Sequence, residues 1–104
     1  MRRVNYIDSE LSNIQVILIN LELCEEQPNL SLNCFSNHHM YVMNFFNISN
    51  LNIHDFSFPF QIQGFEILSN KGKGWQKELS YTIQDFEDNI LSFYCEDFEI
   101  FVVE

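Results

Sequence analysis

Apolar and polar residues alternate with a period of two through most of this 104-residue chain. In QVILINLEL, every second residue from Ile17 to Leu23 would share one face, because successive side chains of a strand point to opposite sides of a sheet. Comparable runs recur at roughly ten-residue spacing, with short polar breaks between them, which is typical of a sandwich or barrel. We therefore expect a mainly β fold of about eight mostly antiparallel strands, a sandwich or an open barrel, with little helix.

The whole chain, residues 1–104, is expected to form a single domain, since its length is ordinary for one. The hydrophobic content of 46%, with eleven Phe, excludes intrinsic disorder. Asp8–Leu21 is the best candidate for a helix, with a cap at one of its first two residues. Its β-branched residues Val16, Ile17 and Ile19 favour a strand instead.

Two segments call for unusual backbone conformations. In FPFQIQGFEIL the apolar phase slips by one residue at Gly64, which predicts a β-bulge at that position. SNKGKGW predicts a loop, because Asn70, Gly72 and Gly74 tolerate left-handed conformations.

The charge distribution is the second strong constraint. Fifteen acids oppose five Lys and Arg, which gives a net charge of −10 at pH 7, and no base lies from Glu78 onward. On so small a surface these charges should produce a negative potential that repels nucleic acid and anionic membranes and speeds encounter with basic proteins. We expect a larger protein with a basic surface as partner, no direct nucleic-acid or membrane partner, and leave the oligomeric state open.

Two acidic clusters lie on either side of the apolar stretch from Ile90. Strands at Leu79–Phe86 and Ile90–Cys95 are predicted to form a hairpin, and a third strand is predicted to return through Phe98–Val103. The carboxylates would then lie at strand ends and turns, either as a solvated rim or as a surface for a basic partner. For the second interpretation the predicted partner-binding residues are Asp85, Glu87, Asp88, Glu96, Asp97, Glu99 and Trp75.

No targeting or membrane segment is expected. Acidic residues interrupt any apolar core in MRRVNYIDSE, and the apolar run Ile14–Cys24 is too short for a membrane helix. Three cysteines, an odd number, argue against a secreted disulfide framework, so we expect a cytoplasmic protein with reduced thiols.

Metal ligands are suggested faintly in two places. Cys34, His38 and His39, with or without Cys24, lack the paired chelating turns of zinc sites, and buried packing is the simpler role for these cysteines. A calcium loop counted from Asp85 would need Gly at its sixth position, where Ile90 stands. We expect neither a metal nor another cofactor.

Catalysis is not predicted either. Asp85 and Glu87 could share a strand face, and His54 adjoins Asp55, but no third group completes a mechanism. Solvated strand ends explain these pairs more simply. We therefore expect a protein that is not an enzyme.

Trp75 lies in the one basic and aromatic segment, KGKGWQK. Such a segment can stack on and neutralise a nucleic acid, although the negative charge of the rest of the chain opposes this. A lid on the core and a protein-binding hot spot are equally compatible with the pattern.

The segment Gln61–Ile100 resembles small acidic immunity proteins encoded beside polymorphic toxins in bacteria. The shared features are a GFEI strand, a Gly-Trp loop, YTIQDFED as a strand with acids at its end, and an F-x-C-x-x-F strand. The resemblance implies that the chain binds a cognate toxin and neutralises it by covering its active site. It implies no individual contact residues.

Three functions follow as hypotheses. The first is a non-enzymatic acidic immunity protein that inhibits a bacterial toxin. The second is a phage-encoded inhibitor of a host defence nuclease, such as an anti-CRISPR or other anti-defence protein that mimics nucleic acid. The third is a small-molecule-binding β-barrel, which would need a concave pocket with converging polar groups.

Overall fold

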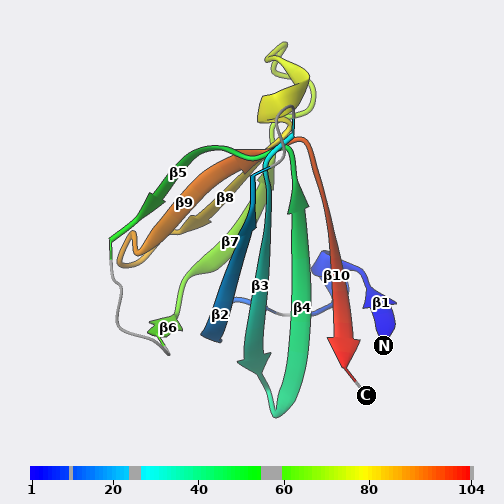
Figure 1. Cartoon of the computed structure of the whole chain (residues 1–104), viewed down its shortest axis with the longest axis vertical. Coiled ribbons are helices and arrows are strands. Elements are labelled where there is room, and N and C mark those ends of the chain that lie inside the picture. The colour runs from blue at the N-terminus through cyan, green and yellow to red at the C-terminus, as the bar shows by residue number, and fades with distance from the viewer. Residues whose placement is uncertain (10, 24–26, 55–59, 104) are drawn as a thin grey trace.

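The computed structural model describes residues 1–9, 11–23, 27–54 and 60–103. Within these ranges ten strands form two antiparallel sheets that face each other across a shared core (Figure 1). The expected mainly β, antiparallel architecture is therefore confirmed, and the two sheets stay separate rather than closing into a barrel. Strands β1 and β6 have three residues each, and β1 is too short to show an alternation in the sequence.

The larger sheet has six strands and forms the front layer in Figure 1. Every neighbouring pair in it is antiparallel. Its strands, in spatial order, are β1 (Arg2–Val4), β10 (Asp97–Val103), β4 (His39–Phe46), β3 (Asn29–Ser36), β2 (Ile14–Glu22) and β6 (Phe60–Ile62).

The smaller sheet has four strands and lies behind the first. Helical structure in the described residues amounts to α1 (Tyr6–Ser9) and the 3-10 turn η1 (Lys77–Leu79). The strands of this sheet, in spatial order, are β5 (Ser49–Ile53), β9 (Leu91–Cys95), β8 (Tyr81–Asp85) and β7 (Phe65–Ser69).

The core is built from the inward residues of both sheets. Alternate residues of β3, β4 and β9 are buried, as the period-two pattern predicts. Phe45 of β4 meets Phe93 of β9 edge to face, with ring centroids 5.0 Å apart, and so joins the two layers. Such an aromatic pair adds about 1 kcal/mol beyond the area that the rings bury.

The segment around Val16 forms strand β2, as its β-branched residues predict. The register with β3 shifts between Val16 and Leu18, so Ile17 is the extra residue of a β-bulge. Ile14 and Val16 are fully buried, whereas Leu21 is 42% exposed. The continuous apolar face predicted from Ile17 to Leu23 is therefore interrupted, and its buried part lies earlier in the chain.

Gly64 does not form the predicted bulge. It lies where the chain leaves β6 in the larger sheet and enters β7 in the smaller one, so the phase slip marks a change of sheet. A Cβ atom here would lie 2.9 Å from both the Cγ and the backbone nitrogen of Glu87. The Gly64 carbonyl also accepts the Phe86 N–H at 2.8 Å, so glycine permits this close approach.

The C-terminal strands differ from the prediction in one respect. Strands β8 and β9 form the expected hairpin. Strand β10, however, follows β9 after Glu96 alone and pairs with β4 and β1 in the other sheet. The three predicted strands are thus divided between the two layers, and their acidic residues are divided with them.

Candidate interaction surface

The six predicted acidic residues do not form one cluster. Glu87 and Asp88 lie in the turn before β9, whereas Glu96, Asp97 and Glu99 follow that strand. The five residues of β9 separate the two groups by roughly 17 Å, at about 3.3 Å per residue. A partner that contacts one group therefore need not contact the other.

Asp85 differs from the other five acids because its side chain is only 2% exposed. Its Oδ1 accepts the N–H groups of Glu87 at 3.1 Å and Asp88 at 3.4 Å, and its Oδ2 accepts that of Ile90 at 3.2 Å. These bonds satisfy backbone donors of the β8–β9 turn that no strand partner reaches. We therefore assign Asp85 to the fold and remove it from the partner-binding set.

Glu99 is held on the outer face of the larger sheet. Asn44 Nδ2 donates to Glu99 Oε1 at 3.0 Å, and Ser31 Oγ donates to Asn44 Oδ1 at 2.8 Å. The three residues stand side by side on β3, β4 and β10. This hydrogen-bonded row fixes the position of the carboxylate before any partner arrives.

Glu96 and Asp97 also accept hydrogen bonds. Glu96 is partly buried and accepts a hydrogen bond from Asn47 Nδ2 at 3.0 Å. Asp97 is exposed, and its Oδ1 accepts the N–H of Phe98 at 2.8 Å.

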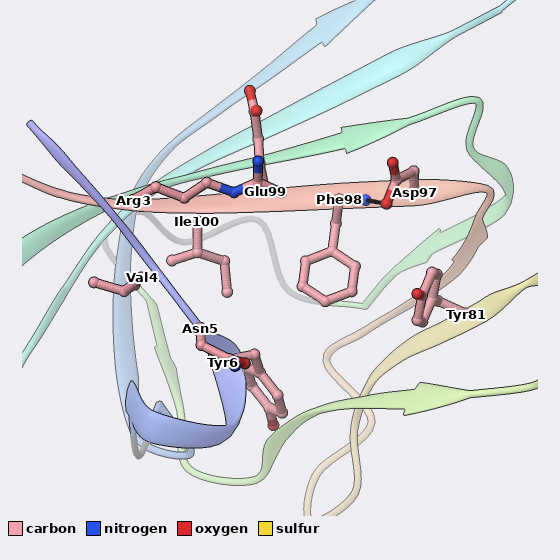
Figure 2. A pocket seen from close by; sticks show the side chains of 9 residues that line it. All are labelled: Arg3, Val4, Asn5, Tyr6, Tyr81, Asp97, Phe98, Glu99 and Ile100. Carbon is pink, nitrogen blue, oxygen red and sulfur yellow. Dashed lines mark hydrogen bonds between the residues drawn. The ribbon is translucent and has the colours of Figure 1, made fainter.

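A groove of about 490 Å³ opens between β10 and the smaller sheet (Figure 2). Phe98 points into it and meets Tyr81 edge to face, with ring centroids 4.9 Å apart. The carboxylates of Asp97 and Glu99 point to the opposite side of β10, and the Arg3 side chain runs along the strand toward Glu99. The aromatic rings of Tyr6, Tyr81 and Phe98 line the groove together with polar residues, and the carboxylates of Asp97 and Glu99 point to the outer face of the larger sheet.

Tyr6 closes one end of this groove. Its hydroxyl accepts the N–H of Ile67 at 3.3 Å and lies 3.5 Å from the Phe65 carbonyl oxygen, to which it donates. Burial is the main reason that the pKa of Tyr6 is raised. The phenol is thus neutral at physiological pH and satisfies the edge of β7, which is a structural role.

Trp75 lies on the surface and is 49% exposed. Its ring meets Tyr94 edge to face at 6.4 Å, and Lys73 Nζ lies 4.8 Å from the centroid of the indole. The loop that carries it has the predicted left-handed glycines, with φ of 93° at Gly72 and 75° at Gly74. Trp75 is therefore a half-covered surface aromatic over the smaller sheet, apart from the outer face that carries Asp97 and Glu99.

The potential zinc ligands do not come together. Cys34 is buried in the core, whereas His38 and His39 are exposed at the β3–β4 turn, where Asn37 and His38 have φ of 50° and 67°. Cys24 lies outside the described residues. Within the described residues no group of three or more His, Cys, Asp or Glu is placed to hold a metal ion.

The two thiols in the core are kept protonated, and therefore unreactive, by their burial. Cys34 and Cys95 are free and fully buried, and burial raises the pKa of each to about 12.

His54, which was considered together with Asp55 as a possible catalytic pair, is exposed. Its backbone N–H donates to the carbonyl oxygen of Ile90, and Asp55 lies outside the described residues.

The outer face of the larger sheet carries an apolar patch that was not among the predicted binding residues. Strands β4 and β10 carry apolar residues at outward as well as inward positions, a signal visible in MYVMNFF and FEIFVV. Within this patch Phe35 is 41% exposed and Val103 is 38% exposed. We define the apolar patch as Phe35, Met40, Val42, Phe101 and Val103.

Comparisons of this chain with protein-family models, with curated proteins and with solved structures find no match. Among the helices of the described residues, none is long and apolar enough to cross a membrane.

Proposed function

We propose that this chain is a non-enzymatic, acidic binding protein that inhibits a basic partner protein in the cytoplasm, most concretely as an immunity protein that neutralises a cognate bacterial toxin. The observation that carries the proposal is the run of acids after Lys77 without a single Lys or Arg. Of these acids, Glu87, Asp88 and Asp97 are exposed to solvent. Surface carboxylates that outnumber the bases of the chain favour a positively charged partner and raise its association rate.

The surroundings of the acids support a binding role over catalysis. Glu99 accepts a hydrogen bond from the amide of Asn44, which in turn accepts one from the hydroxyl of Ser31, and Asp85 is used by the backbone of a turn. A toxin that acts on nucleic acid or phosphate esters has a basic active site, and covering that site with carboxylates would block its substrate.

The proposal is tested by capture followed by an inhibition assay. The tagged chain is used as bait in a lysate of its native cell, the bound protein is identified, and its activity is titrated with the purified chain. We expect a larger protein of net positive charge that binds one to one and loses its activity at saturation. Full activity of the saturated partner, or no stoichiometric partner, would contradict the proposal.

A further inference from the structure

The outer face of the larger sheet combines an apolar centre with charged margins. The registers place Phe35, Met40 and Val103 in one row across β3, β4 and β10, with Val42 beside Phe101 in the next row. These residues make up the apolar patch. A contiguous apolar patch on the surface often marks a protein-binding site.

Acidic residues border the patch on one side. Further along the same face lie the row of Ser31, Asn44 and Glu99, and then a row in which Asp97 stands opposite Phe46. Glu22, which is exposed, ends this face on β2. Figure 2 shows the carboxylates of Asp97 and Glu99 pointing to this side of β10. We call Glu22, Asp97 and Glu99 the acidic border.

The excess of carboxylates on this face favours a partner with a basic surface. Three carboxylates of the acidic border stand near two bases of the described residues: Arg3, which lies opposite Phe101 on β1, and Lys71, whose charge interacts with that of Asp97. The complementary surface has an apolar centre and Lys or Arg on the side that meets the border. A second copy of this chain, with its net charge of −10, offers five bases in all and none between Val4 and Asn70.

The face supplies a large part of the area that a specific complex needs, and the surrounding side chains add to it. The four longer strands, β2, β3, β4 and β10, lie at about 4.8 Å spacing, and about eight residues each at about 3.3 Å rise give roughly 500 Å² of sheet. A standard interface takes about 800 Å² from each partner. The hydrogen-bonded row of Ser31, Asn44 and Glu99 also lowers the cost of ordering this face on binding.

From the apolar patch, the acidic border and the area of the sheet, we infer that the outer face of the larger sheet is the docking surface for a basic protein partner, which contacts the patch with apolar side chains and the border with Lys or Arg. This inference rests on the proposed function and locates it. It assigns the binding energy to the apolar patch and the steering to Asp97 and Glu99, and it leaves Glu87, Asp88 and Trp75 outside the contact.

Site-specific photo-crosslinking in the native cell tests the location. The benzophenone amino acid p-benzoylphenylalanine replaces Phe101 in the patch, Leu68 on the outer face of the smaller sheet, or Phe86 beside Glu87 and Asp88. Leu68 and Phe86 are exposed and serve as matched controls. We expect an adduct with one larger, basic protein from position 101, and none from 68 or 86.

The charge dependence is read from the same adduct. The double substitution Asp97→Lys with Glu99→Lys should lower its yield by about tenfold or more, because like charges then oppose each other. Asp97→Lys alone provides the second variant, since Glu99→Lys also breaks the bond to Asn44. Circular dichroism and urea unfolding confirm that each variant is folded before its yield is compared.

The remaining outcomes overturn the inference in distinguishable ways. The same basic protein crosslinked from position 68 or 86, but not 101, would move the docking surface elsewhere and leave the proposed function intact. An adduct of twice the mass of the chain would show that a second copy covers the face. No adduct at any position, together with no captured partner, would overturn the inference and the proposed function alike.

Discussion

At the scale of the residue, Asp85 shows that a carboxylate in an acidic segment can serve the fold. Replacing it with Ala leaves three turn N–H groups without their acceptor, and we expect the free energy of unfolding to fall by about 2–4 kcal/mol. Asp85→Asn retains an acceptor oxygen and should lose less. Exposed Asp88→Ala is the control, with a change of about 0.5 kcal/mol or less. Equal urea midpoints for the Asp85→Ala and Asp88→Ala variants would contradict this assignment.

The buried thiols give the protein a dependence on alkaline pH. Burial raises the pKa of Cys34 and of Cys95 from 9.0 to about 12. Between these values the folded state keeps protons that the unfolded thiols have lost, so the free energy of unfolding falls as the pH rises. Each thiol contributes a slope of up to about 1.4 kcal/mol per pH unit, measurable by urea unfolding from pH 8 upward.

A variant without these thiols separates their contribution from that of other groups. Cys34→Ala with Cys95→Ala should be less stable at pH 8, because both side chains fill the core. Its stability should nevertheless decline less steeply above pH 9. Identical pH dependence in the two proteins would show that the thiols titrate normally.

At the scale of the element, the passage from β6 to β7 depends on Gly64. Ala at this position would bring its Cβ to 2.9 Å from the backbone nitrogen of Glu87, and backbone cannot move aside as a flexible side chain can. We expect Gly64→Ala to reduce the free energy of unfolding by about 1–3 kcal/mol. Neighbouring Gln63, which is exposed, provides a control through Gln63→Ala. A Gly64→Ala protein as stable as this control would contradict the close approach.

The same elements show what could be read from the sequence. Alternation is a local property, so the strands and their antiparallel character were predictable, and β2 was correctly favoured over a helix. The sheet to which a strand belongs is not local. The chain changes from one sheet to the other at Gly64 and at Glu96. In the sequence, the phase slip at Gly64 looks the same as a bulge, and the short break at Glu96 looks the same as a tight turn.

The candidate surface was predictable only in part for the same reason. The excess of acids could be counted, but their division between the two ends of β9 follows from the sheet assignment of β10. The burial of Asp85 depends on the turn that closes around it. The apolar patch could be suspected from the sequence, because strands β4 and β10 have apolar residues on both faces. The same pattern is also expected of a strand that is buried on both faces, so it does not by itself predict an exposed patch.

At the scale of the whole molecule, ten net negative charges are spread over a surface of 6306 Å². We assign two roles to this surface. The long-range field brings a basic partner to the molecule, and the apolar patch on the larger sheet holds it there. The first role depends on salt and the second does not, because screening weakens charge interactions and leaves apolar contacts almost unchanged.

The rate constant for association with the captured partner can be measured by stopped flow at increasing ionic strength. From about 50 mM to about 500 mM salt we expect a fall of about tenfold or more for the wild-type chain, while dissociation changes little. The Asp97→Lys, Glu99→Lys variant should associate more slowly at low salt and respond less to added salt. An association rate that neither salt nor these charge reversals change would contradict an acidic inhibitor of a basic protein.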